Sequence, residues 1–221
     1  MTEAVRFPLV LGIVTLCSAA GLAVSYTLTR DEIRLQEELK KARGLAAVFG
    51  VALDEARLQQ PDADLPWQAF AYSDRKGDPD GTFVVSEAID PATGACLYAG
   101  VGRAQGYSSK VEVVVAVDQA VENGLDGATI RAIKIVKQLE TPGLGSNCAR
   151  PEFQRQFTTL PYAMLRLVKG VPFRKPDAEG SEEQPVVALT GATVTSNAVI
   201  GAVRQALERV RHHVATRQST H

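Results

Sequence analysis

The segment that most restricts how this chain can fold is an uncharged, mostly apolar run from Phe7 to Leu28. A helix over this run, rising about 1.5 Å per residue, would extend roughly 33 Å and cross the hydrocarbon core of a bilayer. A cleaved signal peptide is the alternative, but its apolar region usually has only about 7–15 residues, and Arg6 alone makes a weak basic region before it. We therefore expect a short tail over residues 1–6 and a transmembrane helix over residues 7–28.

Basic residues on the two sides of this run bear on its orientation. Arg6 precedes it, whereas five basic residues follow it closely, namely Arg30, Arg34, Lys40, Lys41 and Arg43. By the positive-inside rule, this difference favours a cytoplasmic location for the rest of the chain.

A helical stem is expected after the span. Apolar residues recur from Ile33 to Phe49 at spacings typical of a helix, and Gly50 is a plausible end to it. The stem is assigned to residues 29–60, because the polar, proline-containing stretch from Gln59 to Pro66 marks a boundary. Residues 61–221 remain, which is enough chain for a domain with its own core.

Four segments of this domain are expected to be strands: Thr82–Val85, Ala95–Val101, Lys110–Val117 and Thr129–Val136. The third is so rich in valine that it should be buried on both faces. In the fourth, strict alternation would place Ile133 and Ile135 on one face, and on the other face Ile130, Ala132, Lys134 and Val136.

Helices are expected towards the C-terminus, giving an α+β domain with a small sheet flanked by helices. A short helix should contain Glu152, Phe153 and Phe157. The last should run from about Asn197 to Thr216 with one apolar stripe, made of Val199, Val203, Ala206, Val210 and Val214.

Composition and single residues argue against several functional classes. The chain is 45% hydrophobic and 22% charged with a net charge of -1, so it should be globular, and nothing indicates nucleic acid as a partner. The three cysteines, Cys17, Cys96 and Cys148, show no metal-binding spacing, although the last two could pair in an oxidising compartment. Bulky Leu16 argues against lipidation of Cys17.

Histidine positions and motifs give no support for a stand-alone enzyme. All three histidines, His212, His213 and His221, lie near the C-terminus, where a helix end is expected to fray. The run from Gly100 to Gly106 is similar to a dinucleotide fingerprint, but its last glycine comes one residue late and no helix follows. We expect these glycines to form turns.

Two glycine-containing segments remain as candidate binding sites. The first, Glu140-Thr141-Pro142-Gly143-Leu144-Gly145, follows a predicted strand, and its glycines would let the backbone approach a ligand or simply form a tight turn. The second, Thr190-Gly191-Ala192-Thr193, precedes Val194-Thr195-Ser196-Asn197 and the last helix. A helix N-terminus favours phosphate. Thr195 or Ser196 should serve as the N-cap, which leaves Thr190 and Thr193 without a capping role.

These two segments together resemble the FMN-binding domain family. Thr190–Thr193 is similar to the family's S/T-G-A-T motif, Glu140–Gly145 matches its E-T-P-G-L-G segment, and Gly106-Tyr107 before a valine-rich strand matches a third feature. With one N-terminal span, the chain resembles the G subunits of Rnf-type ion-translocating electron-transport complexes. The C subunits of sodium-translocating NADH:quinone reductases are close relatives within the family.

The resemblance implies a cofactor and its site. FMN would be joined through a phosphoester to Thr193 by a separate flavin transferase. The flavin would be lined by Thr190, Gly191, Ala192, Thr195, Ser196, Tyr107, Glu140, Thr141, Gly143, Leu144 and Gly145. No catalytic side chain or metal is implied, since the flavin would relay electrons between other subunits of the complex.

The resemblance also implies a location, and the chain departs from the family pattern at two places. The domain would lie on the periplasmic side of a bacterial inner membrane, against the charge count, and we adopt this side. Val187 stands where relatives often have an aspartate before the motif, which could reduce flavin attachment. Ser108-Ser109 follow Tyr107 where relatives tend to have two glycines. A membrane-anchored assembly or sensing subunit without flavin is therefore the alternative function.

Overall fold

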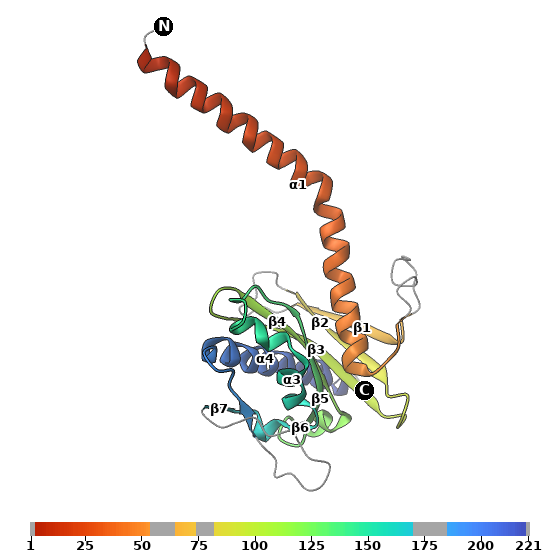
Figure 1. Ribbon diagram of the computed structural model, residues 1–221. Coiled ribbons are helices and arrows are strands. Elements are labelled where there is room, and N and C mark those ends of the chain that lie inside the picture. The colour runs from red at the N-terminus through yellow and green to blue at the C-terminus, as the bar shows by residue number, and fades with distance from the viewer. Residues whose placement is uncertain (1–2, 54–64, 74–81, 170–184, 220–221) are drawn as a thin grey trace. The chain divides into compact units, whose positions relative to one another are not determined.

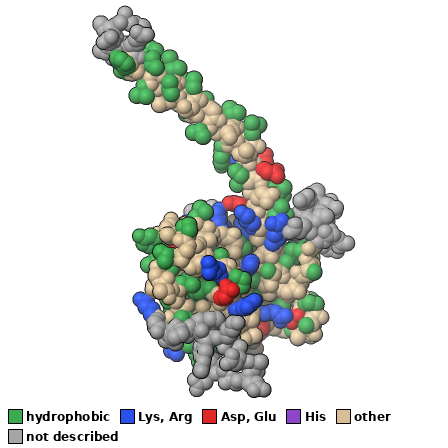
Figure 2. All heavy atoms as spheres, in the orientation of Figure 1, with side chains coloured by type: hydrophobic (Ala, Val, Ile, Leu, Met, Phe, Trp, Pro, Cys, Tyr) green, Lys and Arg blue, Asp and Glu red, His purple; other side chains and the backbone are tan. Residues whose placement is uncertain are grey.

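The N-terminal part of the chain is a single long helix, α1 (Glu3–Phe49). The computed structural model describes residues 3–53, 65–73, 82–169 and 185–219, and the chain divides into two units, Met1–Lys40 and Lys41–His221. Hydrophobic side chains stand out along the helix in the first unit (Figure 2). Among the described residues, this is the one helix long and apolar enough to cross a membrane. The predicted span is thus helical, and so is the described part of the expected tail.

The second unit is built on a six-stranded antiparallel sheet whose strands are neighbours in chain order (Figure 1). Its strands are β1 (Trp67–Ser73), β2 (Thr82–Ile89), β3 (Cys96–Gln105), β4 (Lys110–Val117), β5 (Thr129–Lys137) and β6 (Leu160–Pro161). A separate pair of short parallel strands is formed by β7 (Leu167–Val168) and β8 (Val186–Val187). All four predicted strands are confirmed, although β2 and β3 extend further than expected.

Helices cover both faces of this sheet. The long helix α4 (Thr193–Gln218) crosses one face, as Figure 1 shows, and the end of α1 from Lys41 onwards packs on the other. Strand β4 alternates between them: Val113 and Val115 join the core beneath α4, whereas Val114 and Ala116 join the core beneath α1. The prediction that this strand is buried on both faces is confirmed, and so is the buried stripe of the last helix.

Short helices connect the remaining elements. They are η1 (Gln119–Asn123), η2 (Gly145–Ala149), α3 (Pro151–Gln154), η3 (Arg155–Phe157) and η4 (Tyr162–Met164). Phe153 and Phe157 from α3 and η3 are buried in the core beneath α4, as expected for the predicted short helix. The mixed helix-and-sheet class is therefore confirmed. The predicted boundary at 59–66 lies mostly outside the described residues.

Two glycines within β3 allow α4 to approach the sheet closely, so the expectation that they form turns is wrong. A Cβ atom on Gly102 would lie 1.8 Å from the Ala202 carbonyl oxygen, and one on Gly100 would lie 2.7 Å from the Ala206 carbonyl oxygen. Helix and strand backbones are thus in direct contact. The nearest helix atoms at both points belong to alanines, and larger residues on either side would hold the layers apart.

The sheet faces on which the side chains of β5 lie also differ from the prediction. Ile130 packs in the same core as Ile133 and Ile135, because the pairing with β4 shifts between Ala116 and Val117. This irregularity places an extra residue, Arg131, between Ile130 and Ala132, and it breaks the strict alternation. Arg131 uses its position to bind Asp90, with Nη1 2.6 Å from Oδ2.

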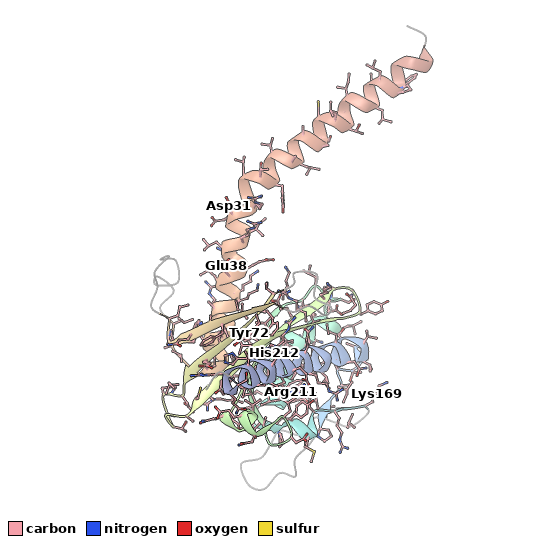
Figure 3. All side chains as sticks on the ribbon, turned by 180° about the vertical axis from the view of Figure 1, so that it is seen from behind. Asp31, Glu38, Tyr72, Lys169, Arg211 and His212 are labelled. Atoms are coloured by element: carbon pink, nitrogen blue, oxygen red, sulfur yellow. The ribbon has the colours of Figure 1, made fainter. Side chains whose placement is uncertain are left out.

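The C-terminal half of α4 is fixed to the sheet by a polar and aromatic cluster. His213 is 1% exposed; its Nε2 lies 2.5 Å from Glu87 Oε1, and its Nδ1 is hydrogen-bonded to the Tyr72 hydroxyl. His212 packs edge-on against Tyr72, and the two can be seen close together in Figure 3. The expectation that His212 and His213 lie in a frayed end is therefore wrong. His221 lies outside the described residues.

The cysteines of the domain are free and well separated. Cys96 begins β3, whereas Cys148 is fully buried in η2, close to the loop that follows β5. Because β3 extends roughly 30 Å at about 3.3 Å per residue, the two cysteines lie near opposite ends of the sheet, too far apart for a disulfide. Burial raises the pKa of the Cys148 thiol to about 11, so this thiol is unreactive in the folded domain.

Candidate functional site

The three segments singled out in the sequence meet around one carboxylate, that of Glu140. This residue follows β5, and its side chain points at the hairpin between β3 and β4. Its Oε1 accepts hydrogen bonds from the amides of Ser108 and Ser109 at 3.0 and 2.9 Å, and its Oε2 accepts one from the Tyr107 amide at 3.1 Å. Residues about thirty positions apart are thereby held together.

The start of α4 is joined to the same carboxylate. The hydroxyl of Thr195 donates a hydrogen bond of 2.6 Å to Glu140 Oε2, and both residues are buried. Burial acts to raise the pKa of Glu140, but the bonds from Thr195 and the three hairpin amides outweigh it and hold the pKa below its ordinary value. The carboxylate is therefore charged at neutral pH.

Close packing around Glu140 explains two of the glycines. A Cβ atom on Gly106 would lie 2.6 Å from Glu140 Oε1, and one on Gly145 would lie 2.6 Å from Thr195 Oγ1. Any side chain at either position would separate the segments. These glycines thus serve the contact among the three segments, beyond any role in turning the chain.

The loop from Thr141 to Gly145 is closed by its own hydrogen bonds. The amides of Leu144 and Ser146 both donate to the Thr141 carbonyl oxygen at 3.2 Å, and the Asn147 side chain donates to the Gly143 carbonyl oxygen at 2.7 Å. Gly143 has a φ of 77°, which favours glycine. The loop therefore presents a fixed shape with Thr141, Gly143 and Leu144 on the surface.

A tight turn precedes α4 and exposes the second motif. The Ala192 amide bonds to the Leu189 carbonyl oxygen at 3.0 Å, and Gly191 within this turn has a φ of 73°. The Ser196 hydroxyl fixes the turn to the helix: it donates to the Ala192 carbonyl oxygen and accepts from the Leu189 amide, both at 3.0 Å.

The expectation that Thr195 or Ser196 caps the helix is wrong. The helix begins at Thr193, Ala192 occupies the N-cap position, and no side chain caps it. Thr195 and Ser196 lie within the first turn and direct their hydroxyls to Glu140 and to the preceding turn. The amides at the start of the helix are thus left without a side-chain partner, which is the arrangement that favours an anion.

The four hydroxyls of this motif fall into two classes. Those of Thr195 and Ser196 are buried and hydrogen-bonded within the protein. Those of Thr190 and Thr193 make no side-chain hydrogen bond to any other described residue; Thr190 is exposed and Thr193 half-buried. Only the latter two are available to an incoming group.

Exposed apolar side chains lie on the same three segments. Tyr107 is 74% exposed, Leu139 76%, Val194 52% and Leu144 45%. They come from the hairpin, from both sides of Glu140 and from the first turn of α4. Sequence reasoning missed Leu139 and Val194, and it missed the hydrogen-bonding role of Ser109. For Leu139 and Val194, the signal available in the sequence was a large apolar residue directly beside a motif position.

The structure thus brings all the predicted site residues into neighbouring segments, but not all of them to the surface. Seven of them are exposed or partly exposed: Thr190, Gly191, Thr193, Tyr107, Thr141, Gly143 and Leu144. The buried members are Ala192, Thr195, Ser196, Glu140 and Gly145. Among the described residues, no group of acidic, cysteine and histidine side chains could hold a metal ion.

Comparison with known proteins gives relatives for this part of the chain. One is the G subunit of a proton-translocating ferredoxin:NAD(+) oxidoreductase complex from Clostridium ljungdahlii, 35% identical over 49% of this chain and 50% of the relative. Another is the G subunit of an ion-translocating oxidoreductase complex from Methanosarcina acetivorans, 39% identical over 38% of this chain and 39% of the relative. The chain spans about half the length, or less, of the curated relatives it matches.

Solved structures show the same fold over more of the chain. The C subunit of the Na(+)-translocating NADH-quinone reductase from Parabacteroides distasonis superimposes with a TM-score of 0.56, covering 80% of this chain and 92% of that one at 20% identity. NqrC from Shewanella oneidensis gives a TM-score of 0.60, covering 83% of this chain and 99% of that one at 16% identity. At such identities the likeness establishes the fold.

The model of the FMN-binding domain family matches residues 106–208, which run from the hairpin glycine through the Glu140 loop and into α4. This segment contains all three parts of the site described above. Residues 106–208 of the chain are therefore similar to the FMN-binding domain family.

Proposed function

We propose that this protein is a membrane-anchored flavoprotein that relays electrons through FMN attached to Thr193, as a subunit of an ion-translocating oxidoreductase complex. The observation that carries the proposal is the Thr193 hydroxyl, which stands at the first position of α4 and makes no side-chain hydrogen bond to another described residue. The match to the FMN-binding domain family and the names of the relatives supply the cofactor and the kind of complex.

The residues around Thr193 fit the phosphate of FMN. The uncapped start of α4 offers backbone amides and the positive end of the helix dipole, which together stabilise an anion. The dipole alone contributes only about 0.3–1 kcal/mol, too little to retain a cofactor without further contacts or a covalent bond. Gly191 is exposed, and a Cβ atom on it would lie 3.1 Å from Leu144 Cδ2, so the absence of a side chain lets the Glu140 loop lie against this turn.

The surface nearby fits the isoalloxazine ring. Tyr107, Leu139, Leu144 and Val194 present apolar surface around the site, as flat aromatic cofactors require. When bound, FMN would supply the redox chemistry, and the protein would supply its position and surroundings. No acid–base side chain is needed for that role.

Attachment requires an activated flavin. The Thr193 Oγ would form a bond to the FMN phosphorus while the bond from that phosphorus to the bridging oxygen of a flavin dinucleotide breaks, and a nucleoside monophosphate leaves. The hydroxyl proton would pass to a base of the flavin transferase, which is the partner needed for maturation. Electrons would come from and go to other subunits of the membrane complex, with the domain on the periplasmic side of a bacterial inner membrane.

An anchored assembly or sensing subunit without flavin is the second candidate. Val187 favours it, because the resemblance to the family implies an aspartate at this position that the transferase could read. In the structure Val187 lies half-buried in β8, and its amide donates to Gln156 Oε1 at 2.7 Å. The backbone at this position is thus firmly held whichever side chain it carries.

Flavin fluorescence on a denaturing gel distinguishes these functions. The full chain would be produced together with a flavin transferase, denatured, and viewed under ultraviolet light beside a Thr193→Val variant. We expect a fluorescent band for the wild type and none for the variant, since valine keeps the shape and removes the nucleophile. A band that persists in Thr193→Val would exclude Thr193 as the attachment residue, and a wild type without fluorescence would favour the flavin-free function.

A further inference from the structure

Resting on the function proposed above, we propose that Glu140 is a positioning residue of the flavin site. Its carboxylate, held by the hairpin between β3 and β4, fixes the first turn of α4 through Thr195 and so orients the Thr193 hydroxyl for attachment. The resemblance to the family implied a different role, in which Glu140 lines the flavin. Its geometry in this structure indicates that it acts through Thr195.

The carboxylate is surrounded by protein donors. Glu140 is 6% exposed, and its two oxygens accept three backbone amides and two hydroxyls, those of Thr195 and Ser109. A carboxylate with this many charge-assisted bonds is both fixed in place and held charged. Few of its lone pairs remain for a ligand on the surface.

Thr195 connects this charge to the attachment residue. It lies two residues after Thr193 in the first turn of α4 and is 1% exposed. Its hydroxyl donates the short 2.6 Å bond to Glu140 Oε2. A rotation or shift of this turn would move Thr193 relative to the hairpin and the Glu140 loop, because helix residues within one turn move together.

Ser109 adds a hydroxyl to this arrangement. Its hydroxyl donates to Glu140 Oε1 at 3.3 Å and accepts from the Leu139 amide at 2.8 Å, so it links the hairpin to the strand end on both sides of the carboxylate. The resemblance to the family implies a glycine at this position, which would have no hydroxyl. The serine at this position thus adds contacts to the Glu140 carboxylate and to the Leu139 amide.

The test measures flavin attachment to variants of the purified full chain. Flavin transferase and saturating flavin adenine dinucleotide would be added, and the initial rate would be followed by gel fluorescence. Thr195→Val keeps the shape of the side chain and removes the donor, and we expect it to lower the rate by about tenfold to about a hundredfold, as small misplacements of a nucleophile do. Thr195→Ser restores the donor and should keep the rate within about twofold of the wild type.

A lower rate of flavin attachment can come from a loss of folding stability or from a misplaced Thr193 hydroxyl, and a control variant separates the two causes. Val210→Ala removes fully buried contacts from the far half of α4, and it would be studied at a temperature where its folded fraction equals that of Thr195→Val. We expect Val210→Ala to accept flavin at nearly the wild-type rate. Equal losses in the two variants would contradict a positioning role and show that only stability matters.

Two neighbouring serines give a second matched pair. Ser109→Ala removes the hydroxyl that contacts Glu140 and Leu139, whereas Ser108→Ala removes an exposed hydroxyl and keeps the backbone amide that bonds to Glu140. We expect slower attachment for Ser109→Ala than for Ser108→Ala. If the wild type accepts flavin but Thr195→Val and Ser109→Ala match it, the positioning role is wrong and the proposed function stands. If the wild type accepts none, the proposed function itself fails.

Discussion

At the scale of single residues, the site depends on how hydroxyl groups are divided between the protein and its surroundings. Thr195 and Ser196 use theirs to hold the start of α4, whereas Thr190 and Thr193 keep theirs available. The sequence predicted this division, because it left Thr190 and Thr193 without a capping role, but its reason was wrong, since neither Thr195 nor Ser196 caps the helix.

Glu140 should make the folded domain sensitive to acid. Its pKa is lowered in the folded state, so its charged form contributes stability above its ordinary pKa of about 4.3, and this contribution is lost as the pH falls through the lower folded value. Urea unfolding between about pH 7 and about pH 3 would be compared for the wild type and Glu140→Gln. We expect the wild type to be more stable at neutral pH and the difference to shrink as the pH is lowered.

The comparison between the wild type and Glu140→Gln also controls for the titration of other acidic residues. Asp90 also has a lowered pKa, through hydrogen bonds from the Ala92 amide and Thr93 and its bond to Arg131, and it titrates in both proteins. Its effect therefore cancels in the difference. A difference between wild type and Glu140→Gln that stays constant with pH would mean that the Glu140 charge contributes nothing.

At the scale of secondary-structure elements, direct contact between β3 and α4 sets the position of the helix start. Gly100 and Gly102 of β3 permit this contact, and their neighbours in α4 are Ala206 and Ala202. If α4 stood further from the sheet, Thr195 could not reach Glu140. The glycines of β3 thus act on the site from about two turns of helix away.

Gly102→Ala should be strongly destabilising. The new methyl group would lie 1.8 Å from the Ala202 carbonyl oxygen, so helix and strand must separate, and overpacking of this kind costs about 1–3 kcal/mol or more. Gly127→Ala is the matched control, because a Cβ atom there meets no atom within 4 Å. Urea titration should give a lower midpoint for Gly102→Ala alone; equal midpoints would show that the layers can adjust.

The elements most easily predicted were those with a strong local pattern. Strand β4 and the stripe on α4 follow directly from runs of valine and from helical spacing. Strand β1 was missed, because it lies at the edge of the sheet and its stability comes from pairing with β2. The bulge that turns Ile130 inward, and the contacts of Glu140 with residues 33 and 55 positions away, depend on the folded chain and leave no local signal.

At the scale of the whole molecule, the apolar start of α1 is expected to anchor the chain in a membrane. A retained anchor and a cleaved signal peptide differ in a simple way, since only the former leaves residues 7–28 in the mature protein. We expect the chain to stay with the membrane after extraction with alkaline carbonate. A variant with Leu16→Arg and Leu22→Arg should be released, because each arginine costs about 2.5–3.5 kcal/mol at the centre of a span.

Protease treatment of sealed vesicles determines the side on which the domain lies. In right-side-out vesicles, we expect added protease to digest the domain, which corresponds to the periplasmic location. Protection of the domain in these vesicles, with digestion only after they are opened, would contradict that location and agree with the count of basic residues around the span. Release of the wild-type chain by alkaline carbonate would contradict the prediction that residues 7–28 anchor it in the membrane.

The central claim is that FMN is covalently bound at Thr193, and mass spectrometry of the chain produced together with a flavin transferase tests it most directly. Intact mass reports whether one FMN has been added, and fragmentation of the peptide that contains residues 190–196 locates it. The account predicts the mass of one FMN phosphoester on Thr193 in the wild type and an unmodified chain in Thr193→Val. An unmodified wild type, or FMN located on Thr190, would contradict it.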